Sequence, residues 1–135
     1  MKLRRTMAAT GLALATLTTL ALGASPAGAA DVVTCGTVHV ADPTDGRQVK
    51  LAGTGCFHSY GDKFTLTDEN SDSYHVEIWW QTGYGRTGIC RNIDKAGSTV
   101  TCNYDMREGE TLLFEVHAMN DGVSIMAGPR KNVII

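Results

Sequence analysis

Apolar and polar residues alternate with a period of two along most of the chain after residue 30, and no segment shows a helical period. Val76, Ile78 and Trp80 fall on one side of an extended chain, for example. His75 and Glu77 fall on the other side. The pattern predicts strands over residues 33–42, 47–57, 63–67, 74–81, 86–91, 99–103, 111–119 and 123–127.

Glycine, aspartate and asparagine gather between these segments, as turns require. Asp45-Gly46 is the strongest hairpin signal near the start, because a type I′ turn needs positive φ at both central residues. Short strands at such spacing predict an all-β fold, a small antiparallel β-sandwich of the Ig-like kind. The tail, residues 128–135, ends in Val-Ile-Ile and is expected to add a last edge strand.

Residues 1–29 have the three-part layout of a secretory signal peptide. A basic start ends at Arg5, an apolar run follows, and Ala27-Gly28-Ala29 supplies the small residues of a cleavage site. A membrane anchor is the alternative, but the apolar run is shorter than the roughly 20 residues that span a bilayer. We therefore expect residues 30–135 to form one secreted, extracellular domain with no membrane anchor after cleavage.

Removal of residues 1–29 lowers the formal net charge from −2 to −5, because three of the 12 basic residues lie there and none of the 14 acidic ones. The remaining chain has no basic excess of the kind that binds nucleic acid. An unknown extracellular protein or a glycan is the expected partner.

The four cysteines predict two disulfides, because an even number in an exported chain is typical of an oxidised framework. A two-residue turn at Asp45-Gly46 places Cys35 directly opposite Cys56, within disulfide reach. The same register puts Val40 opposite Leu51 and Asp42 opposite Val49. It also puts Ala52 on the outer face with the cystine.

The remaining pair, Cys90 and Cys102, brackets residues 93–97, which have the composition of a second hairpin loop. Both disulfides are therefore expected within β-hairpins. The alternative is a zinc site, but the cysteines are separated by 20, 33 and 11 residues and lack the close spacing that zinc prefers.

Two sets of side chains raise the question of a metal. His75 and Glu77 share one side of a strand, as do Glu115 and His117, so neighbouring strands would bring four ligand-type groups together. A solvent-facing ladder of polar pairs is the alternative. The sequence Asp68-Glu69-Asn70-Ser71-Asp72 starts like a calcium loop but lacks the later glycine and glutamate, and an acidic turn is the simpler interpretation. We predict no metal and no cofactor.

Catalytic motifs give no support to an enzyme. There is no G-x-S-x-G elbow, and disulfide formation would leave no thiolate. A pair of carboxylates for glycoside hydrolysis remains open from sequence. We predict a protein that is not an enzyme and has no catalytic residues.

Trp79, Tyr84 and Arg86 are the predicted binding residues. Trp79 lies outside if Trp80 joins the core, and a glycine-flanked loop presents Tyr84 and Arg86 just beyond it. Trp, Tyr and Arg are enriched at binding hot spots. The alternative is that the tail or a second sheet covers Trp79.

The second half of the chain resembles small secreted two-disulfide β proteins of actinobacteria. The resemblance is carried by Gly88-Ile89-Cys90-Arg91-Asn92, by Cys102-Asn103-Tyr104-Asp105-Met106-Arg107-Glu108-Gly109 and by Leu113-Phe114-Glu115-Val116. It implies an exported, disulfide-bonded β domain and assigns no active site.

A more distant similarity is to the proteinaceous α-amylase inhibitors, which are small exported β-sandwiches with two disulfides. Their Trp-Arg-Tyr motif has no match here, where the nearest elements are Trp79-Trp80 and Tyr84-Gly85-Arg86. The sequence therefore predicts a secreted binding module, such as an inhibitor of a secreted hydrolase. A carbohydrate or cell-wall binder and an antimicrobial protein are the alternatives.

Overall fold

The computed structural model describes residues 30–42 and 44–135. The expected signal peptide, residues 1–29, and Pro43 lie outside the described residues. The described part contains no helix, and so none that is long and apolar enough to cross a bilayer. Its nine strands are β1 Val33–Ala41, β2 Val49–His58, β3 Lys63–Asp68, β4 His75–Thr82, β5 Thr87–Asn92, β6 Thr99–Asn103, β7 Thr111–Asn120, β8 Val123–Ala127 and β9 Lys131–Ile134. Every predicted strand is confirmed to within two residues, and the tail supplies β9.

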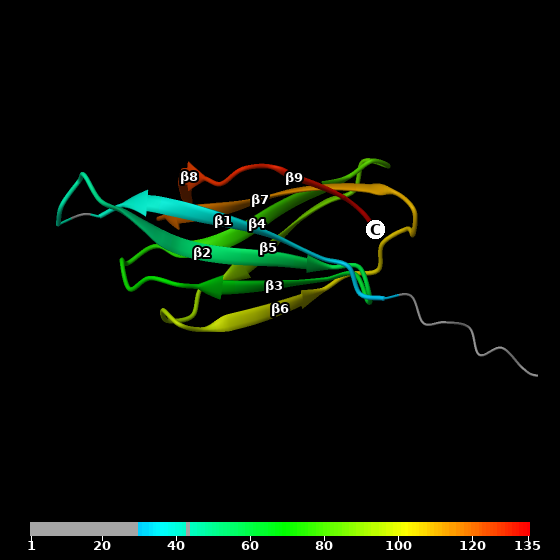
Figure 1. Cartoon of the computed structure of the whole chain (residues 1–135), viewed down its shortest axis with the longest axis horizontal. Coiled ribbons are helices and arrows are strands. Elements are labelled where there is room, and N and C mark those ends of the chain that lie inside the picture. Colours follow the sequence, from blue (N-terminus) through cyan, green and yellow to red (C-terminus); the bar gives the residue numbers. More distant parts are fainter. Residues whose placement is uncertain (1–29, 43) are drawn as a thin grey trace, which may run out of the picture.

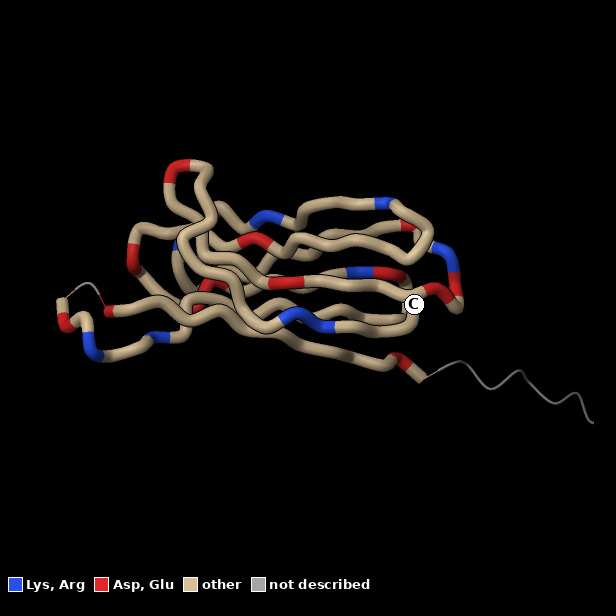
Figure 2. The backbone as a smooth tube through the Cα atoms, turned by 90° about the horizontal axis from the view of Figure 1, so that it is seen from above, with Lys and Arg blue, Asp and Glu red and all other residues tan. Residues whose placement is uncertain are grey.

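The strands form two antiparallel sheets that pack face to face, which confirms the predicted sandwich (Figure 1). Sheet A has the order β1-β2-β3-β6. Sheet B has the order β5-β4-β7, and both β8 and β9 pair with the free edge of β7. Acidic and basic positions are interspersed around the molecule and do not gather by sign on one side (Figure 2).

Alternate residues of the two facing sheets fill the core. Phe64 of β3 lies at its centre, with its ring centroid 5.1 Å from that of Phe57 and 5.3 Å from that of Phe114. Val76, Ile78 and Trp80 face it from β4, while Leu112, Phe114 and Val116 do so from β7. The period-two pattern of the sequence thus corresponds to the inward and outward faces of each sheet.

Glycines on the inner face of sheet A allow the two sheets to approach closely. A Cβ at Gly55 would lie 2.6 Å from Cδ1 of Ile78, and one at Gly53 would lie 2.7 Å from Cγ1 of Val76. Both distances are below van der Waals contact. The aliphatic side chains of β4 therefore occupy the space that larger residues in β2 would need.

The first disulfide joins Cys35 and Cys56, which are register partners on β1 and β2 with Cα atoms 4.0 Å apart. The predicted pairing and the predicted register are both confirmed here. Thr37 also lies opposite Thr54, as the hairpin prediction requires.

Closer to the turn the predicted register is wrong by one residue, and a β-bulge between Val38 and His39 restores it farther out. Val40 lies opposite Lys50 instead of Leu51, and Val49 pairs with Ala41 instead of Asp42. Ala52 is the extra residue of the bulge, and it is buried in the core instead of on the outer face.

The turn itself explains the shift. Gly46 does not take the positive φ of a type I′ turn, and the strands end at Ala41 and begin again at Val49, farther apart than a two-residue turn requires. The Gln48 N–H donates to the Asp45 carbonyl, and the Asp42 N–H donates to the Gln48 carbonyl. The two-residue Asp-Gly turn is found instead at Asp121-Gly122, where φ is 46° and 81°.

The second disulfide joins Cys90 and Cys102 as predicted, but it does not lie within a hairpin. Cys90 belongs to β5 of sheet B, and Cys102 belongs to β6 of sheet A. The chain crosses between the sheets at residues 93–98, so this bond ties one sheet to the other.

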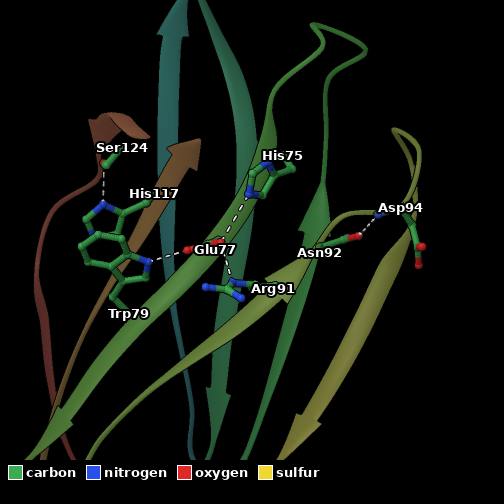
Figure 3. Close-up of polar contacts among 8 residues, drawn as sticks. All are labelled: His75, Glu77, Trp79, Arg91, Asn92, Asp94, His117 and Ser124. Carbon is green, nitrogen blue, oxygen red and sulfur yellow. Dashed lines mark hydrogen bonds and ion pairs between the residues drawn. The ribbon is translucent and has the colours of Figure 1, made fainter. Parts of the chain in front are cut away.

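Asn92 holds this crossover at its start. Its side chain is fully buried, and Nδ2 donates to the carbonyls of Leu66 and Ser98. Its Oδ1 accepts a hydrogen bond from the Asp94 N–H (Figure 3). It accepts another from the Ser98 hydroxyl. A buried amide with all of these partners stabilises the connection at little desolvation cost.

Candidate functional site

The candidate site lies on the outer face of sheet B, where β4 pairs with β7. Glu77 lies opposite His117, and Trp79 lies opposite Glu115. The two strands carrying His75-x-Glu77 and Glu115-x-His117 are therefore neighbours, which is the arrangement that the metal hypothesis requires.

Glu77 is the buried centre of this face, with 3% of its surface exposed. Its Oε2 accepts a hydrogen bond from the indole Nε1 of Trp79 at 2.6 Å. Its Oε1 accepts one from Arg91 Nε at 2.8 Å and lies 3.3 Å from Nε2 of His75 (Figure 3). Burial acts to raise the pKa of Glu77, but the bonds from Trp79 and His75 and the charge of Arg91 outweigh it, and the pKa lies below 4.5. Glu77 is therefore an ionised carboxylate at neutral pH.

The indole of Trp79 stacks on the imidazole of His117, with ring centroids 4.3 Å apart and planes 22° from parallel. The Nδ1 atom of His117 is hydrogen-bonded to Ser124 Oγ of β8 at 2.8 Å (Figure 3). Its Nε2 lies 3.4 Å from Glu115 Oε2 without forming a hydrogen bond, and it is buried. Burial lowers the pKa of His117 against the opposing charges of Glu115 and Glu77, which keeps the ring neutral at neutral pH.

The side chains that could have bound a metal are engaged in hydrogen bonds within the protein. Glu77 binds Trp79 and Arg91, while His117 bonds Ser124. In residues 30–42 and 44–135 no group of three or more His, Cys, Asp and Glu side chains is arranged to hold a metal ion. The arrangement is a ladder of polar pairs with an aromatic cover.

The acidic segment at residues 68–72 uses its oxygens internally as well. Asp68 Oδ1 accepts the Asn70 N–H, and Asp72 Oδ1 accepts the Tyr74 N–H. Burial, together with the nearby charges of Asp72 and Glu69, raises the pKa of Asp68. This segment is a hydrogen-bonded acidic turn.

A groove of about 530 Å³ lies beside Trp79 on the outer face of sheet B, and we call it the Trp79 groove. Trp79 is 40% exposed and Ile89, its partner on β5, is 43% exposed. Arg130 donates from Nε to Glu115 Oε1 at 2.5 Å on the other side. The lining consists of Trp79, Trp80, Gln81, Thr87, Gly88, Ile89, Leu113, Phe114, Glu115, His117 and Arg130.

The structure does not bring Tyr84 and Arg86 to this groove. Trp80 points into the core, opposite to Trp79, and the Arg86 guanidinium lies 5.7 Å from its ring centroid. Arg86 also donates to the Asp105 carbonyl. Arg86 is therefore held on the Trp80 side of the strand.

Tyr84 packs against the core beside Arg86. Its hydroxyl accepts the Arg107 N–H at 3.3 Å, and the Arg107 guanidinium lies 4.7 Å from its ring centroid. The three predicted binding residues therefore belong to two surfaces. Trp79 lies on the outer sheet face, and Tyr84 and Arg86 lie at the end of the sandwich.

Sequence reasoning missed Arg91, Ser124 and Arg130. Arg91 lies opposite Glu77 in the β4–β5 register. Counting outward from a hairpin turn at residues 83–85 would have placed the two residues opposite each other. Arg130 comes from the irregular segment between β8 and β9, where no periodic pattern indicates where a side chain points.

Comparisons of the chain with protein-family models, with curated proteins and with solved structures found no match. The geometry of the Trp79 groove and its surroundings is therefore the basis for assigning a function.

Proposed function

We propose that the chain is an extracellular binding module that holds a carbohydrate in the Trp79 groove. The observation that carries the proposal is the Trp79 indole, which is 40% exposed on the outer face of sheet B and fixed at its edge by Glu77 and on one face by His117. An aromatic ring provides a large apolar surface on which the C–H face of a sugar can stack. Polar groups beside such a surface supply orientation and specificity.

Preorganisation supports this role. The hydrogen bond to Glu77 and the stack on His117 hold the indole in one orientation, so little side-chain freedom remains to be lost when a ligand binds. An exposed aromatic held in this way contrasts with a mobile surface side chain, which must be ordered at each binding event.

An extracellular location is supported by the two disulfides. Disulfides persist in oxidising compartments and are rare in the cytosol. The leader-like sequence of residues 1–29 agrees with export.

Depletion from solution by insoluble polysaccharides tests the proposal. The purified disulfide-bonded protein is mixed with cellulose, chitin, mannan and peptidoglycan sacculi, and the unbound fraction is measured. We expect at least one polymer to deplete the protein, and Trp79→Ala to weaken that binding at least tenfold.

Tyr60→Ala is the matched control, because Tyr60 is an aromatic residue that is 69% exposed and lies outside the Trp79 groove. It should bind like the parent protein. Failure of every polymer to retain the parent protein would overturn the proposal, as would unchanged binding by Trp79→Ala.

The end of the sandwich favours a second candidate, recognition of a protein such as a secreted hydrolase. The Arg86 guanidinium lies 5.7 Å from the ring centroid of the buried Trp80, and the Arg107 guanidinium lies 4.7 Å from that of Tyr84, so aromatic rings hold two arginines of the kind enriched at binding hot spots. If this surface inhibits a hydrolase, the Tyr84→Ala/Arg86→Ala variant should lose inhibition in a panel of secreted glycosidases and proteases. Trp79→Ala should keep it.

A further inference from the structure

The polar side chains of the Trp79 groove are balanced in charge. Arg130 and Glu115 form an ion pair at 2.5 Å, and Glu115 also lies 3.4 Å from His117. A ligand with a net charge would meet an opposite and a like charge at almost the same place. Such a pair gives a charged ligand little net attraction, while the ligand still loses its hydration.

The same pair suits a group that both donates and accepts hydrogen bonds. Arg130 uses Nε–H for Glu115, and its side chain is 67% exposed, so its remaining donors are open to further partners. Glu115 is an acceptor only. A sugar hydroxyl is both donor and acceptor, so two adjacent hydroxyls can donate to Glu115 and accept from Arg130 at once.

A buried group without a partner marks the same place. The Nε2 atom of His117 has no hydrogen-bond partner within the described residues, and His117 lines the groove. Buried polar atoms are nearly always paired in folded proteins, and Glu115 Oε2 lies 3.4 Å from this one, so a small movement of Glu115 on ligand binding would supply its partner.

The spacing also fits one sugar ring. Trp79 and Glu115 are direct cross-strand partners, so their Cβ atoms are about 5 Å apart. A single ring can therefore stack on the indole and present its hydroxyls to Glu115 and Arg130.

We infer that the Trp79 groove selects neutral sugars, with Glu115 and Arg130 reading two adjacent hydroxyls of the ring that stacks on Trp79. This inference rests on the proposed carbohydrate-binding function. A uronic acid whose carboxylate is drawn to Arg130 would also meet Glu115, and an amino sugar whose ammonium is drawn to Glu115 would also meet Arg130, so neither gains net attraction to offset its lost hydration.

Matched oligosaccharides that differ in charge test the selection. Calorimetric titration would compare a chitin hexamer with a chitosan hexamer, and a mannan hexamer with a mannuronate hexamer. We expect a neutral member to bind at least tenfold tighter than its charged counterpart. Glu115→Gln and Arg130→Gln should each weaken the neutral sugar at least fivefold and reduce the discrimination.

Glu69→Gln is the control, because Glu69 is an exposed carboxylate away from the groove, and it should bind like the parent protein. Thermal unfolding would verify that each variant folds. Equal or tighter binding of the charged sugars, or unchanged binding by both groove variants, would overturn the charge selection but leave carbohydrate binding intact. Binding of no sugar in any titration or depletion would overturn the proposed function itself.

Discussion

The carboxylate of Glu77, which is 3% exposed, accepts a hydrogen bond from the indole of Trp79, which is 40% exposed. A buried charge thus lies at the edge of an exposed aromatic ring on the outer face of a sheet. The outward side of sheet B is therefore organised by its own network, in the same way that the inward side is organised by the core.

Replacement of Glu77 by Gln should destabilise the protein, because the neutral amide cannot accept the charged bonds from Arg91 and Trp79 equally well. Hydrogen bonds to charged groups contribute roughly 1.5–3 kcal/mol, so we expect a loss of about 1–3 kcal/mol in the free energy of unfolding. Urea denaturation measures it. Glu69→Gln removes an exposed carboxylate and should change stability by less than about 0.5 kcal/mol; equal losses for the two variants would contradict the role assigned to Glu77.

Stability should fall as the pH drops below 6.5, because burial lowers the pKa of His117 from that value. Above 6.5 the ring is neutral in both states, and below it the unfolded chain takes up a proton that the folded protein resists. The loss continues until the pH passes the folded pKa.

The carboxylates with lowered pKa values do not titrate in this window, whereas Asp68, whose pKa burial raises, gains stability on protonation and would oppose the loss at the acidic end. Hydrogen bonding lowers the pKa values of Asp31 and Glu77 below 3.8 and 4.5, so their contributions are lost only at more acidic pH. Urea unfolding at pH 7.5, 6.5 and 5.5 would measure the slope, and His117→Gln should flatten it. An unchanged slope in His117→Gln would assign the effect to another group.

The two disulfides should differ in their contribution to stability. They close loops with sequence separations of 21 and 12 residues, a difference that the chain-entropy relation converts into only about 0.5 kcal/mol. The difference in burial should therefore decide which disulfide contributes more to stability. Cys90 is fully buried between the sheets, and Cys35 is exposed on a strand pair that is already hydrogen-bonded. We expect Cys90→Ala/Cys102→Ala to lose roughly 2–5 kcal/mol and Cys35→Ala/Cys56→Ala to lose less, as measured by urea unfolding without reductant.

Gly55→Ala should overpack the core, since the new methyl group would lie 2.6 Å from Ile78 and 3.0 Å from Val116. Overpacking of this kind costs about 1–3 kcal/mol. Gly46→Ala is the matched control, because no atom lies within 4 Å of the position that its new methyl group would take and its φ is not positive. Thermal unfolding of the two variants compares them, and a similar melting temperature for both would show that sheet A can move away from β4.

The strands and the cysteine pairing were predictable because both depend on local spacing. Alternation located the strands to within two residues, and the predicted register at Cys35 and Cys56 is right because the bulge after Val38 offsets the one-residue shift at the turn. Alternation assigns a residue to one face of its sheet, but it does not say which sheet a strand joins. For that reason the pairing of Cys90 with Cys102 was right while its placement in a hairpin was wrong.

Turn chemistry was a weaker guide. The Asp-Gly signal at residues 45–46 falls in a longer loop, whereas the same dipeptide at residues 121–122 forms the tight turn. The bulge at Ala52 compensates for the longer loop by moving the register one residue, and the burial of Ala52 in the core is a tertiary effect. No local pattern encodes it.

The candidate site was predictable in part. Residue types indicated Trp79, and alternation placed it outside the core. Its partners depend on which strands are neighbours and on the path of the chain after β8, so Arg91 and Arg130 were not identified. Tyr84 and Arg86 follow Trp79 closely in sequence, but the loop that carries them turns toward residues 104–107.

Because of the position of the Cys90–Cys102 bond, the two sheets are joined more firmly at one side of the sandwich than at the other. At the β5–β6 side the sheets share a covalent bond, and the chain has no other cysteine pair that could join them at the opposite side. There β1 meets β8 and β9 through packing alone, with Gly128 against the carbonyl of Thr37. Partial separation of the layers would therefore start at β1 and β8 and pivot about the cystine, and amide hydrogens should exchange fastest along that unlinked margin.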